Sequence, residues 1–225
     1  MNTVSIVVPM YRTAATAIEL HRRLSDAVDG WDRAEFIYVD DACDDGSAEA
    51  ISSLKTLDPR VVAVRHTSNR GQHQAIRSGL RHTTGESVVV LDADLQDPPE
   101  AIPALLSYLH ASDFDAVFAG RTGQYEGRIR LATGRLFKCL LARVAQTPID
   151  AGGYVAMKRL MVDDLLAQSR KSPYLLADVA ATGRPITSIP VVRQERAVGN
   201  SATSSLTRLR LGFSALNTAW GTRKK

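Results

Sequence analysis

The chain has 225 residues and a mass of 24.4 kDa, which suits one large domain, or a domain with an appendage, around a sizeable buried core. Its composition, 44% apolar with 15 Gly and 9 Pro, excludes fibrous, collagenous and wholly disordered proteins. The net charge of +4 is too small for a dedicated nucleic-acid-binding protein, but it is unevenly distributed. Residues 193–225 hold seven Lys or Arg against one Glu, a net charge of +6, so residues 1–192 carry −2.

Two features bear on the cellular compartment. The two cysteines, Cys43 and Cys139, are too few for a disulfide framework or a thiolate zinc site, which predicts a reducing cytoplasm. Residues 1–12 lead directly into a strand pattern without a charged leader, so we expect no signal peptide. The longest stretches without Asp, Glu, Lys or Arg have 12 residues, whereas a spanning helix needs about 20 apolar residues, so we expect no membrane span.

The first 120 residues alternate short β-branched runs with amphipathic segments of helical length. The predicted strands are 4–8, 35–39, 61–65, 87–91 and 116–119. The predicted helices between them are 14–28, 47–56, 72–82 and 98–109. Strands separated by single helices indicate right-handed crossovers, and therefore a mainly parallel sheet with helices on both faces.

The second half of the chain is less regular. We expect a loop at 121–126, a helix around 128–145, a strand at 153–157, a helix at 159–167 and a strand at 186–192. Further on, apolar residues recur at spacings of three and four, which is typical of an amphipathic helix; they are Leu206, Leu209, Phe213, Leu216 and Trp220.

Acidic residues follow two of the predicted strands. The second strand leads into Asp40 and Asp41, the fourth into Asp92 and Asp94, and Tyr11 follows the first. In open α/β sheets ligands bind outside the carboxyl ends of the strands, so these side chains mark the expected site. Four carboxylates at one edge repel one another unless a cation lies among them, which favours a metal site. The five histidines lack paired metal-ligand spacing and are interpreted as surface or core-edge residues.

Residues 88–100, with the sequence VVVLDADLQDPPE, carry most of the chemical information. Asp92 and Asp94 are two residues apart, and side chains so spaced in an extended segment point the same way, so both can face one ion. Oxygen ligands suit Mg²⁺ or Mn²⁺, which commonly bridge to substrate phosphates. Asp97, Pro98 and Glu100 fit the N-cap, first and third positions of a helix. Taken alone, the Asp-x-Asp triplet also fits a solvated turn.

In context, this segment resembles the family 2 glycosyltransferases, and within them the dolichyl- or polyprenyl-phosphate sugar transferases. Residues 92–100 match the family signature DADLQDPPE at nine of nine positions. Other segments are similar to family motifs in the same order: VVPMY at 7–11, VDDACDDGS at 39–47, NRG at 69–71, GR at 120–121, DAGGY at 150–154 and RAVGNS at 196–201. The resemblance implies an α/β fold of the GT-A type: a Rossmann-like, mainly parallel sheet flanked by helices, with a C-terminal amphipathic helix.

The resemblance implies a nucleotide-sugar donor. Pro9, Tyr11 and Asp40 would line its base and ribose, with Asp41 beside them, because a carboxylate accepts hydrogen bonds from a base N–H or a ribose hydroxyl. The alternative for Tyr11 is an ordinary half-buried ring. The alternative for the two carboxylates is capping of the turn at 44–46.

The resemblance places the donor diphosphate on a Mg²⁺ or Mn²⁺ ion. Asp92 and Asp94 would hold this ion, Gln96 would offer an amide oxygen to it, and Ala93 would line the donor between the two carboxylates. The ion lowers the barrier to breaking the anomeric C–O bond because it neutralises the nucleoside-diphosphate leaving group.

Several arginines are candidate phosphate ligands. Arg121 would add a cation near the donor phosphates, and so would Arg196; the alternative for each is a surface ion pair. Arg128, Arg130 and Arg135 are candidates for binding a phosphate on the acceptor, although basic residues on an amphipathic helix also form solvated faces.

The resemblance implies an inverting reaction, and the acceptor decides whether a base is needed. A polyprenyl phosphate is already ionised at pH 7 and needs no general base. For a hydroxyl acceptor, Asp150 is the candidate base.

The chain departs from the family motifs in three places. Arg12 and Thr13 stand where the family usually has Asn-Glu, which removes a carboxylate that helps to hold the base and leaves guanine and uracil both open. Ala42 and Cys43 replace the Gly and Ser of VDDGS. Ala202 stands where a Lys often follows the late motif, so one phosphate-binding cation is missing.

We expect residues 1–192 to form one glycosyltransferase domain, with a nucleotide-sugar half at 1–120 and an acceptor half at 121–192. The basic amphipathic tail, 193–225, is expected to lie at the cytoplasmic face of the membrane as a peripheral anchor. The alternative is that the tail packs on the body of the protein or on a second copy in a homodimer.

Three functions are in competition. The first is metal-dependent, inverting transfer of a hexose from a nucleotide-diphosphate sugar, of the GDP-mannose or UDP-glucose type, to a polyprenyl phosphate. The second keeps this donor but uses a saccharide or other hydroxyl as acceptor. The third is a catalytically silent nucleotide-binding subunit, against which the intact DADLQ at 92–96 argues. None of the three has a nucleic acid as partner.

Overall fold

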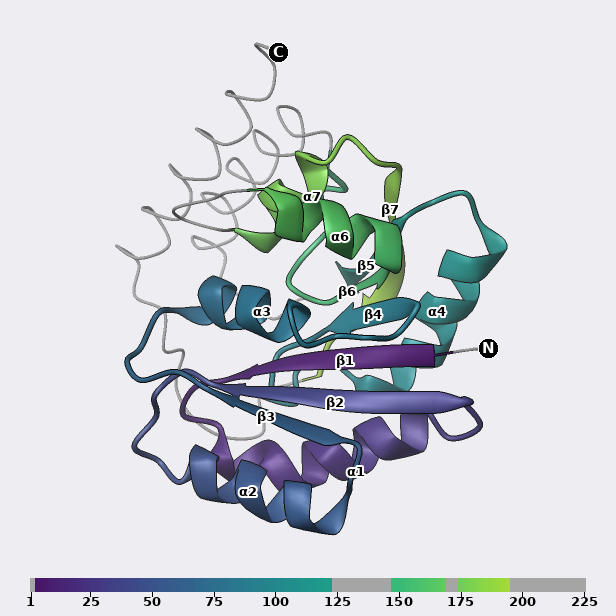
Figure 1. Cartoon of the computed structure of the whole chain (residues 1–225). Helices are drawn as coiled ribbons and strands as arrows, with labels where there is room; N and C mark the ends of the chain where they lie inside the picture. Colours follow the sequence, from purple (N-terminus) through teal and green to yellow (C-terminus); the bar gives the residue numbers. More distant parts are fainter. Residues whose placement is uncertain (1–2, 123–146, 169–173, 195–225) are drawn as a thin grey trace.

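The computed structural model describes residues 3–122, 147–168 and 174–194. A seven-stranded sheet forms the centre of the molecule, with helices on both of its faces (Figure 1). The strands are β1 (Thr3–Met10), β2 (Arg33–Asp40), β3 (Val61–Arg65), β4 (Ser87–Val90), β5 (Ala116–Thr122), β6 (Val155–Lys158) and β7 (Ile186–Val192). The helices are α1 (Ala17–Ala27), α2 (Ser47–Leu57), α3 (Gln72–Leu80), α4 (Ile102–Ala111), α6 (Arg159–Ala167) and α7 (Leu175–Ala180). Short 3₁₀ turns at Ala14–Thr16 and Pro99–Ala101 precede α1 and α4.

The strand order confirms the mainly parallel sheet. It is β3-β2-β1-β4-β6-β5-β7, in which β1 pairs in parallel with β2 and β4, and β2 with β3. The exception is β6, which lies antiparallel between β4 and β5, while β7 pairs in parallel with β5. Strands from both predicted halves of the domain therefore share one sheet.

The apolar strands are explained by burial on both faces. In β1, Ile6 and Val8 belong to one core cluster, which α1, α2 and α4 cover, whereas Val7 belongs to the other, which α3, α6 and α7 cover. Each of these three side chains is fully buried. Burial of a Val or Ile side chain contributes about 1.5–3 kcal/mol, so a strand of this composition is stable only in the middle of such a sheet.

The structure corrects the sequence interpretation at three points in the second half. Arg121 and Thr122 belong to β5, where a loop was predicted, because they continue its pairing with β7. The predicted division between residues 120 and 121 consequently falls inside a strand. The short helix α7 was not predicted, and the predicted helix at 128–145 lies outside the described residues.

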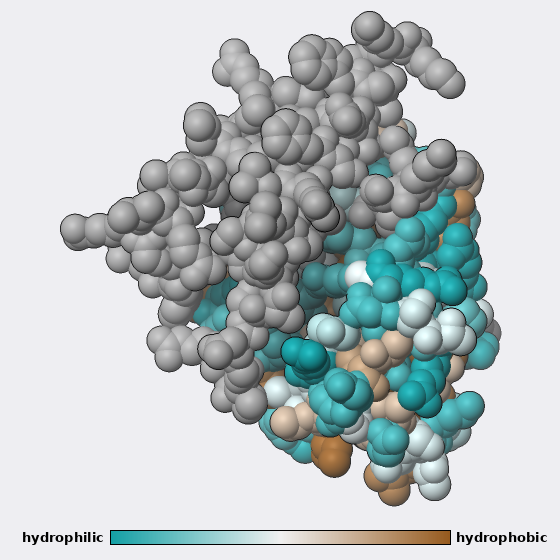
Figure 2. Space-filling view, turned by 90° about the vertical axis from the view of Figure 1, so that its left-hand side faces the viewer, coloured by the Kyte–Doolittle hydropathy of each residue, from teal (hydrophilic) through white to brown (hydrophobic). Residues whose placement is uncertain are grey.

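The carboxyl ends of β1, β2 and β4 lie at one edge of the sheet, since these strands are parallel and adjacent. Figure 2 looks onto the side at which β1 and β2 end, and the described surface there is mainly hydrophilic, with hydrophobic residues in small patches. In the part of the chain that the structure describes, no helix has the length and apolar character needed to cross a membrane.

Candidate active site

Three loops follow β1, β2 and β4 at this edge, and each contains a non-glycine residue with a left-handed backbone. These are Arg12 and Ala42, both with φ of 57°, and Leu95, with φ of 60°. Within the described ranges, no other non-glycine residue has a positive φ. This conformation costs about 1–2 kcal/mol per residue, and such strain concentrates at functional sites. The backbone therefore marks the three loops as the candidate site.

Two of the strained residues are departures from the family motifs. Arg12 and Ala42 replace Asn and Gly, the residue types that adopt a left-handed backbone most readily. A third departure contacts the first, because the backbone N–H of Arg12 donates a hydrogen bond to Cys43 Sγ at 3.2 Å. Burial raises the pKa of the Cys43 thiol to about 11, so the thiol stays protonated at neutral pH. The departures thus meet between the loops after β1 and β2.

Asp40, at the end of β2, combines deep burial with an incompletely used carboxylate. It is 1% exposed, and its Oδ1 accepts a hydrogen bond from the backbone of Cys43 at 3.0 Å. Arg65 Nε lies 3.2 Å from Oδ2, but outside hydrogen-bonding geometry, and no described group donates a hydrogen bond to this oxygen. A cleft of about 460 Å³ opens beside it, lined by Ala42, Cys43, Asp44, Arg65, His66 and Thr67.

The two residues predicted to line the base from β1 differ in accessibility. Pro9 is buried in the strand opposite Val39, so it supports the loop and presents no face to a ligand. Tyr11 is 37% exposed, and the Arg12 guanidinium carbon lies 5.4 Å from the centre of its ring. Of the two, Tyr11 alone retains a surface for contact with a nucleotide.

Asp41, which was predicted to lie beside the nucleotide, is surrounded by internal partners. The residue is 2% exposed. Its Oδ1 lies 2.7 Å from His66 Nδ1 and accepts the backbone N–H of Arg70 at 2.9 Å, while its Oδ2 accepts the backbone N–H of Gly71 at 2.7 Å. His66 Nε2 in turn lies 2.9 Å from Ser78 Oγ of α3. Asp41 therefore shapes the loop before α3.

That loop presents a side chain whose contact with Asp92 was not predicted from the sequence. Gly71, with φ of 87°, turns the chain into α3, and a side chain would be strained in this conformation. The next residue, Gln72, donates a hydrogen bond from Nε2 to Asp92 Oδ1. The NRG motif and the helix start after it indicated a loop near the site. The sequence pattern does not indicate that the loops after β3 and β4 bring Gln72 to Asp92.

In the loop after β4, burial alternates from residue to residue. Asp92 and Asp94 are partly exposed, whereas Ala93 and Leu95 are 3% and 8% exposed. The carbonyl oxygen of Ala93 accepts a hydrogen bond from Thr16 Oγ1 at 2.7 Å, and Asp94 Oδ1 accepts the backbone N–H of Gln96 at 3.1 Å. The alternation agrees with the expectation that the two carboxylates face the same side.

Asp97 is not the predicted helix N-cap. The 3₁₀ turn begins after Pro98, and no side chain caps it. Asp97 is instead 3% exposed, and Arg193, just beyond β7, donates from Nε to its Oδ1 at 3.0 Å. Arg193 Nη2 also lies 4.0 Å from Asp92 Oδ2. The carboxylate is therefore directed inward, where it pairs with the end of the sheet.

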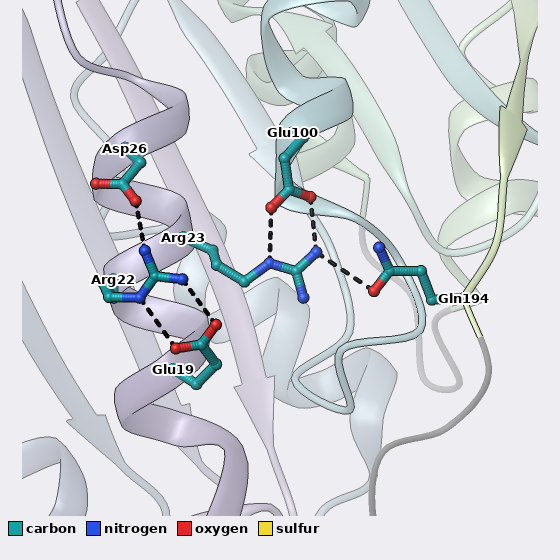
Figure 3. Close-up of polar contacts among 6 residues, drawn as sticks. All are labelled: Glu19, Arg22, Arg23, Asp26, Glu100 and Gln194. Atoms are coloured by element: carbon teal, nitrogen blue, oxygen red, sulfur yellow. Dashed lines mark hydrogen bonds and ion pairs between the residues drawn. The ribbon is translucent and has the colours of Figure 1, made fainter.

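The turn after Asp97 is held from two other elements. Tyr154, just before β6, donates from its hydroxyl to the carbonyl oxygen of Pro98 at 3.0 Å, and burial raises its pKa well above the ordinary value, so the donor proton is retained. Arg23 of α1 donates two hydrogen bonds of 2.7 Å to Glu100 and one of 3.4 Å to Gln194 (Figure 3). The Arg23 hydrogen bonds lower the pKa of Glu100.

Asp150 lies on the other side of the sheet centre from Asp40, against β5 and β7. Its Oδ1 accepts a hydrogen bond from Ser188 Oγ at 2.8 Å, and a Cβ at Gly120 would overlap its Oδ2. This contact explains the glycine of the Gly120-Arg121 motif. Arg121 of β5 pairs with Val191 of β7, and the side chain of Arg121 lies outside the described part of the structure.

The four carboxylates at this edge do not form one cluster around an ion. Among the described residues, no group of three or more His, Cys, Asp or Glu could hold a metal ion. Asp40 and Asp41 are 1% and 2% exposed, whereas Asp92 and Asp94 are partly exposed. Two partly exposed carboxylates fit Mg²⁺ or Mn²⁺, since these ions keep several positions for water and substrate phosphates.

Several predicted residues lie outside the described ranges. They are Arg128, Arg130, Arg135, Arg196, Ala202 and the tail from residue 195 onward.

The chain matches the model of "Glycosyl transferase family 2" over residues 5–166. It is 34% identical over 217 residues to the undecaprenyl-phosphate 4-deoxy-4-formamido-L-arabinose transferase of Sodalis glossinidius, covering 95% of this chain and 66% of that protein. It is 31% identical over 218 residues to the uncharacterized glycosyltransferase YkcC of Bacillus subtilis, covering 95% of this chain and 67% of that one. The chain thus spans about two thirds of the length of these relatives.

Solved structures show the same fold. The mannosyltransferase PcManGT of Pyrobaculum calidifontis, in complex with GDP-Man and Mn²⁺, has a TM-score of 0.65 at 22% identity, covering 97% of this chain and 73% of that one. The glucosyl-3-phosphoglycerate synthase of Mycobacterium tuberculosis, in complex with Mn²⁺ and UDP, has a TM-score of 0.69 at 19% identity, covering 98% and 80%. These likenesses confirm the GT-A fold.

Proposed function

The chain belongs to glycosyl transferase family 2, and from this premise we propose that it transfers a sugar from a nucleotide-diphosphate sugar to a polyprenyl phosphate with the help of Mg²⁺ or Mn²⁺. The named relative acts on undecaprenyl phosphate, which supports this class of acceptor. The sugar in the name of this relative is a substituted arabinose, so the candidate donor sugars extend beyond the hexoses expected from the sequence. A panel of donors is needed to identify the sugar.

One observation carries the donor and metal assignment: Asp92 and Asp94 are partly exposed at the carboxyl end of β4, while the residues between and after them are buried. These two carboxylates would hold the ion, with the Gln96 side chain as the proposed third ligand. When bound, the ion neutralises the diphosphate leaving group. Gln72 holds one oxygen of Asp92, which orients the carboxylate before any ligand binds.

The nucleotide is proposed to lie over the loops after β1 and β2. Asp40 Oδ2 has no hydrogen-bond donor among the described groups, and an unsatisfied buried oxygen is costly, so a base N–H or ribose hydroxyl would stabilise it. Tyr11 offers a partly exposed ring beside the same loops. Asp41 contributes through the shape of the loop before α3, and Arg121 and Arg196 remain proposed cations for the phosphates.

For a polyprenyl phosphate acceptor, the reaction needs no proton transfer from the acceptor, because the phosphate is already an oxyanion. The acceptor oxygen attacks the anomeric carbon while the bond to the diphosphate breaks, and the configuration inverts. Asp150 would be needed as a base only for a hydroxyl acceptor, and its hydrogen bond from Ser188 fixes one of its oxygens. The basic tail, 193–225, is the proposed contact with the cytoplasmic face of the membrane, or with a second copy of the chain.

The test is a panel of radiolabelled donors (GDP-mannose, UDP-glucose, UDP-N-acetylglucosamine and UDP-4-deoxy-4-formamido-L-arabinose), each with Mn²⁺ or with EDTA, and with or without undecaprenyl phosphate. We expect label to move into the organic phase with one donor when both Mn²⁺ and the lipid are present. Asp94→Asn should abolish this transfer, whereas Asp163→Asn, on an exposed part of α6, should not change it.

Three outcomes would contradict parts of the proposal. Transfer that is unchanged in EDTA would show that the reaction needs no divalent metal ion. Label that stays in water-soluble glycan would point to the hydroxyl acceptor and to Asp150. A protein that binds nucleotide and turns over no donor would be the silent subunit.

A further inference from the structure

A guanidinium group lies between two carboxylates at the proposed metal site. Arg193 Nε bonds to Asp97 Oδ1 at 3.0 Å, and Arg193 Nη2 lies 4.0 Å from Asp92 Oδ2. The Arg193 and Asp92 side chains are 21% and 24% exposed, and that of Asp97 is 4% exposed. Gln72 donates to Oδ1 of Asp92, and Arg193 approaches the other oxygen, Oδ2.

The loop does not depend on Arg193 alone for its position. The backbone N–H of Gln194 donates to the carbonyl oxygen of Gln96 at 2.9 Å. Figure 3 shows Arg23 reaching from α1 to both Glu100 and Gln194. With these contacts anchoring the loop, the distinct contribution of Arg193 is its charge beside Asp92.

We propose that Arg193 balances the charge of Asp92 and Asp97 while no divalent cation is bound, and that it thereby weakens the affinity of the site for the free cation. The inference rests on the proposed metal site. A divalent ion at Asp92 would be repelled by the guanidinium, because like charges a few ångströms apart interact by about 1 kcal/mol or more even in water. A nucleoside diphosphate brings negative charge that offsets this repulsion. Arg193 would therefore favour binding of the ion together with its nucleotide.

The experiment titrates Mn²⁺ into nucleotide-free protein and follows the free ion by electron paramagnetic resonance, so that activity is not the readout. The variants are Arg193→Gln, which keeps a hydrogen-bonding group near Asp97, Arg193→Lys, which keeps the charge, and Arg23→Gln, which removes the ion pair to Glu100 in the turn after the loop without touching Asp92. We expect Arg193→Gln to bind Mn²⁺ about tenfold more tightly than the wild type, and the other two to stay within about twofold. The gain in Mn²⁺ affinity that UDP or GDP produces should shrink in Arg193→Gln.

The possible outcomes distinguish failure of the inference about Arg193 from failure of the proposed metal site. Equal or weaker Mn²⁺ binding by Arg193→Gln overturns the inference, and so does an equal gain in Arg23→Gln, since loop anchoring would then explain both. Absence of Mn²⁺ binding in the wild type and in Arg193→Gln overturns the metal site itself, and the inference with it. Melting curves establish folding, and Arg193→Met replaces the Gln variant if the latter does not fold.

Discussion

Two pairs of acidic residues follow β2 and β4, the strands on either side of β1, and the two pairs differ in what surrounds them. Asp40 and Asp41, after β2, are 1% and 2% exposed and contact His66, Arg65 and backbone N–H groups. Asp92 and Asp94, after β4, are partly exposed, and their loop is held by its buried neighbours. In the first pair, Asp41 shapes the neighbouring loop through its hydrogen bonds, and the second pair is the one proposed to hold the ion.

The comparison teaches that a carboxylate at a strand end is not by itself a ligand. The carboxylate of Asp41 accepts hydrogen bonds from the loop that carries Gln72, and the Gln72 side chain in turn orients Asp92. Substitution of Asp41 should therefore affect stability first, and substitution of Asp92 or Asp94 should affect catalysis first. Asp41→Asn tests this division directly, and three further changes, in order of decreasing effect, test the packing and backbone around the site.

The largest effect on stability is expected for Asp41→Asn. The amide keeps the size of the side chain but loses the charge and turns an NH₂ group toward backbone donors, so we expect unfolding free energy to fall by about 4 kcal/mol. Urea unfolding at pH 7 measures this loss. The matched variant Asp94→Asn changes a partly exposed carboxylate and should lose less than about 1 kcal/mol. Equal losses would contradict the division.

Gly120→Ala should come next. A Cβ there would overlap the Asp150 carboxylate, and moving that carboxylate breaks its hydrogen bond from Ser188. We expect a loss of about 3 kcal/mol from overpacking and the lost bond. Asp150→Asn in the Gly120→Ala background should not recover it, since the amide has the same volume, whereas Asp150→Ala should recover part. A Gly120→Ala protein with wild-type stability would show that β5 and Asp150 are not in this contact.

The pH dependence of stability provides a third test, through the neighbour of Gln72. His73 packs against the Tyr174 ring, 4.8 Å between centroids, and burial lowers its pKa from 6.5 to about 4. The unfolded chain therefore binds more protons between these values, so stability falls as the pH falls from 6.5 toward 4. Between about pH 7 and pH 5 the loss should be about 2 kcal/mol. His73→Gln should remove it in urea unfolding, and an unchanged pH dependence would contradict the burial of the neutral imidazole.

The smallest change is a gain. Ala42→Gly relieves the left-handed backbone after Asp41 and should raise the unfolding free energy by about 0.5–1 kcal/mol, since part of the relief is offset by the greater freedom of Gly in the unfolded chain. Ala50→Gly, in the interior of α2, should instead lower it by about 1 kcal/mol. Thermal unfolding distinguishes a gain from a loss, and a loss at Ala42 would mean that its φ is not strained.

The strands and helices of the first half could be predicted from the sequence because the patterns that define them are local. Buried strands such as β1 are continuous apolar runs, and Gly46 and Gly71 mark the starts of α2 and α3. The extension of β5 through Arg121 was not readable, because it depends on pairing with β7, which lies far along the chain. α7 has six residues, too few for a clear period.

The sequence motifs predicted which residues follow the strands at the site, but not the contacts that those residues make. Spacing and strand context pointed to Asp92 and Asp94, which are partly exposed at the end of β4. The burial of Asp41, the inward turn of Asp97 and the approach of Gln72 and Arg193 to Asp92 were not found, because each depends on which loops the sheet brings together. The sequence pattern identifies the carboxylates, and tertiary contacts decide which of them are buried and which are partly exposed.

The most direct test compares Asp94→Asn with Asp41→Asn in two measurements on the same preparations: Mn²⁺-dependent transfer to polyprenyl phosphate, and unfolding free energy. The account predicts that Asp94→Asn loses transfer by about a hundredfold or more while it keeps wild-type stability within about 1 kcal/mol, and that Asp41→Asn mainly loses stability. Full transfer activity in a folded Asp94→Asn protein would contradict the assignment of the β4 loop as the catalytic centre.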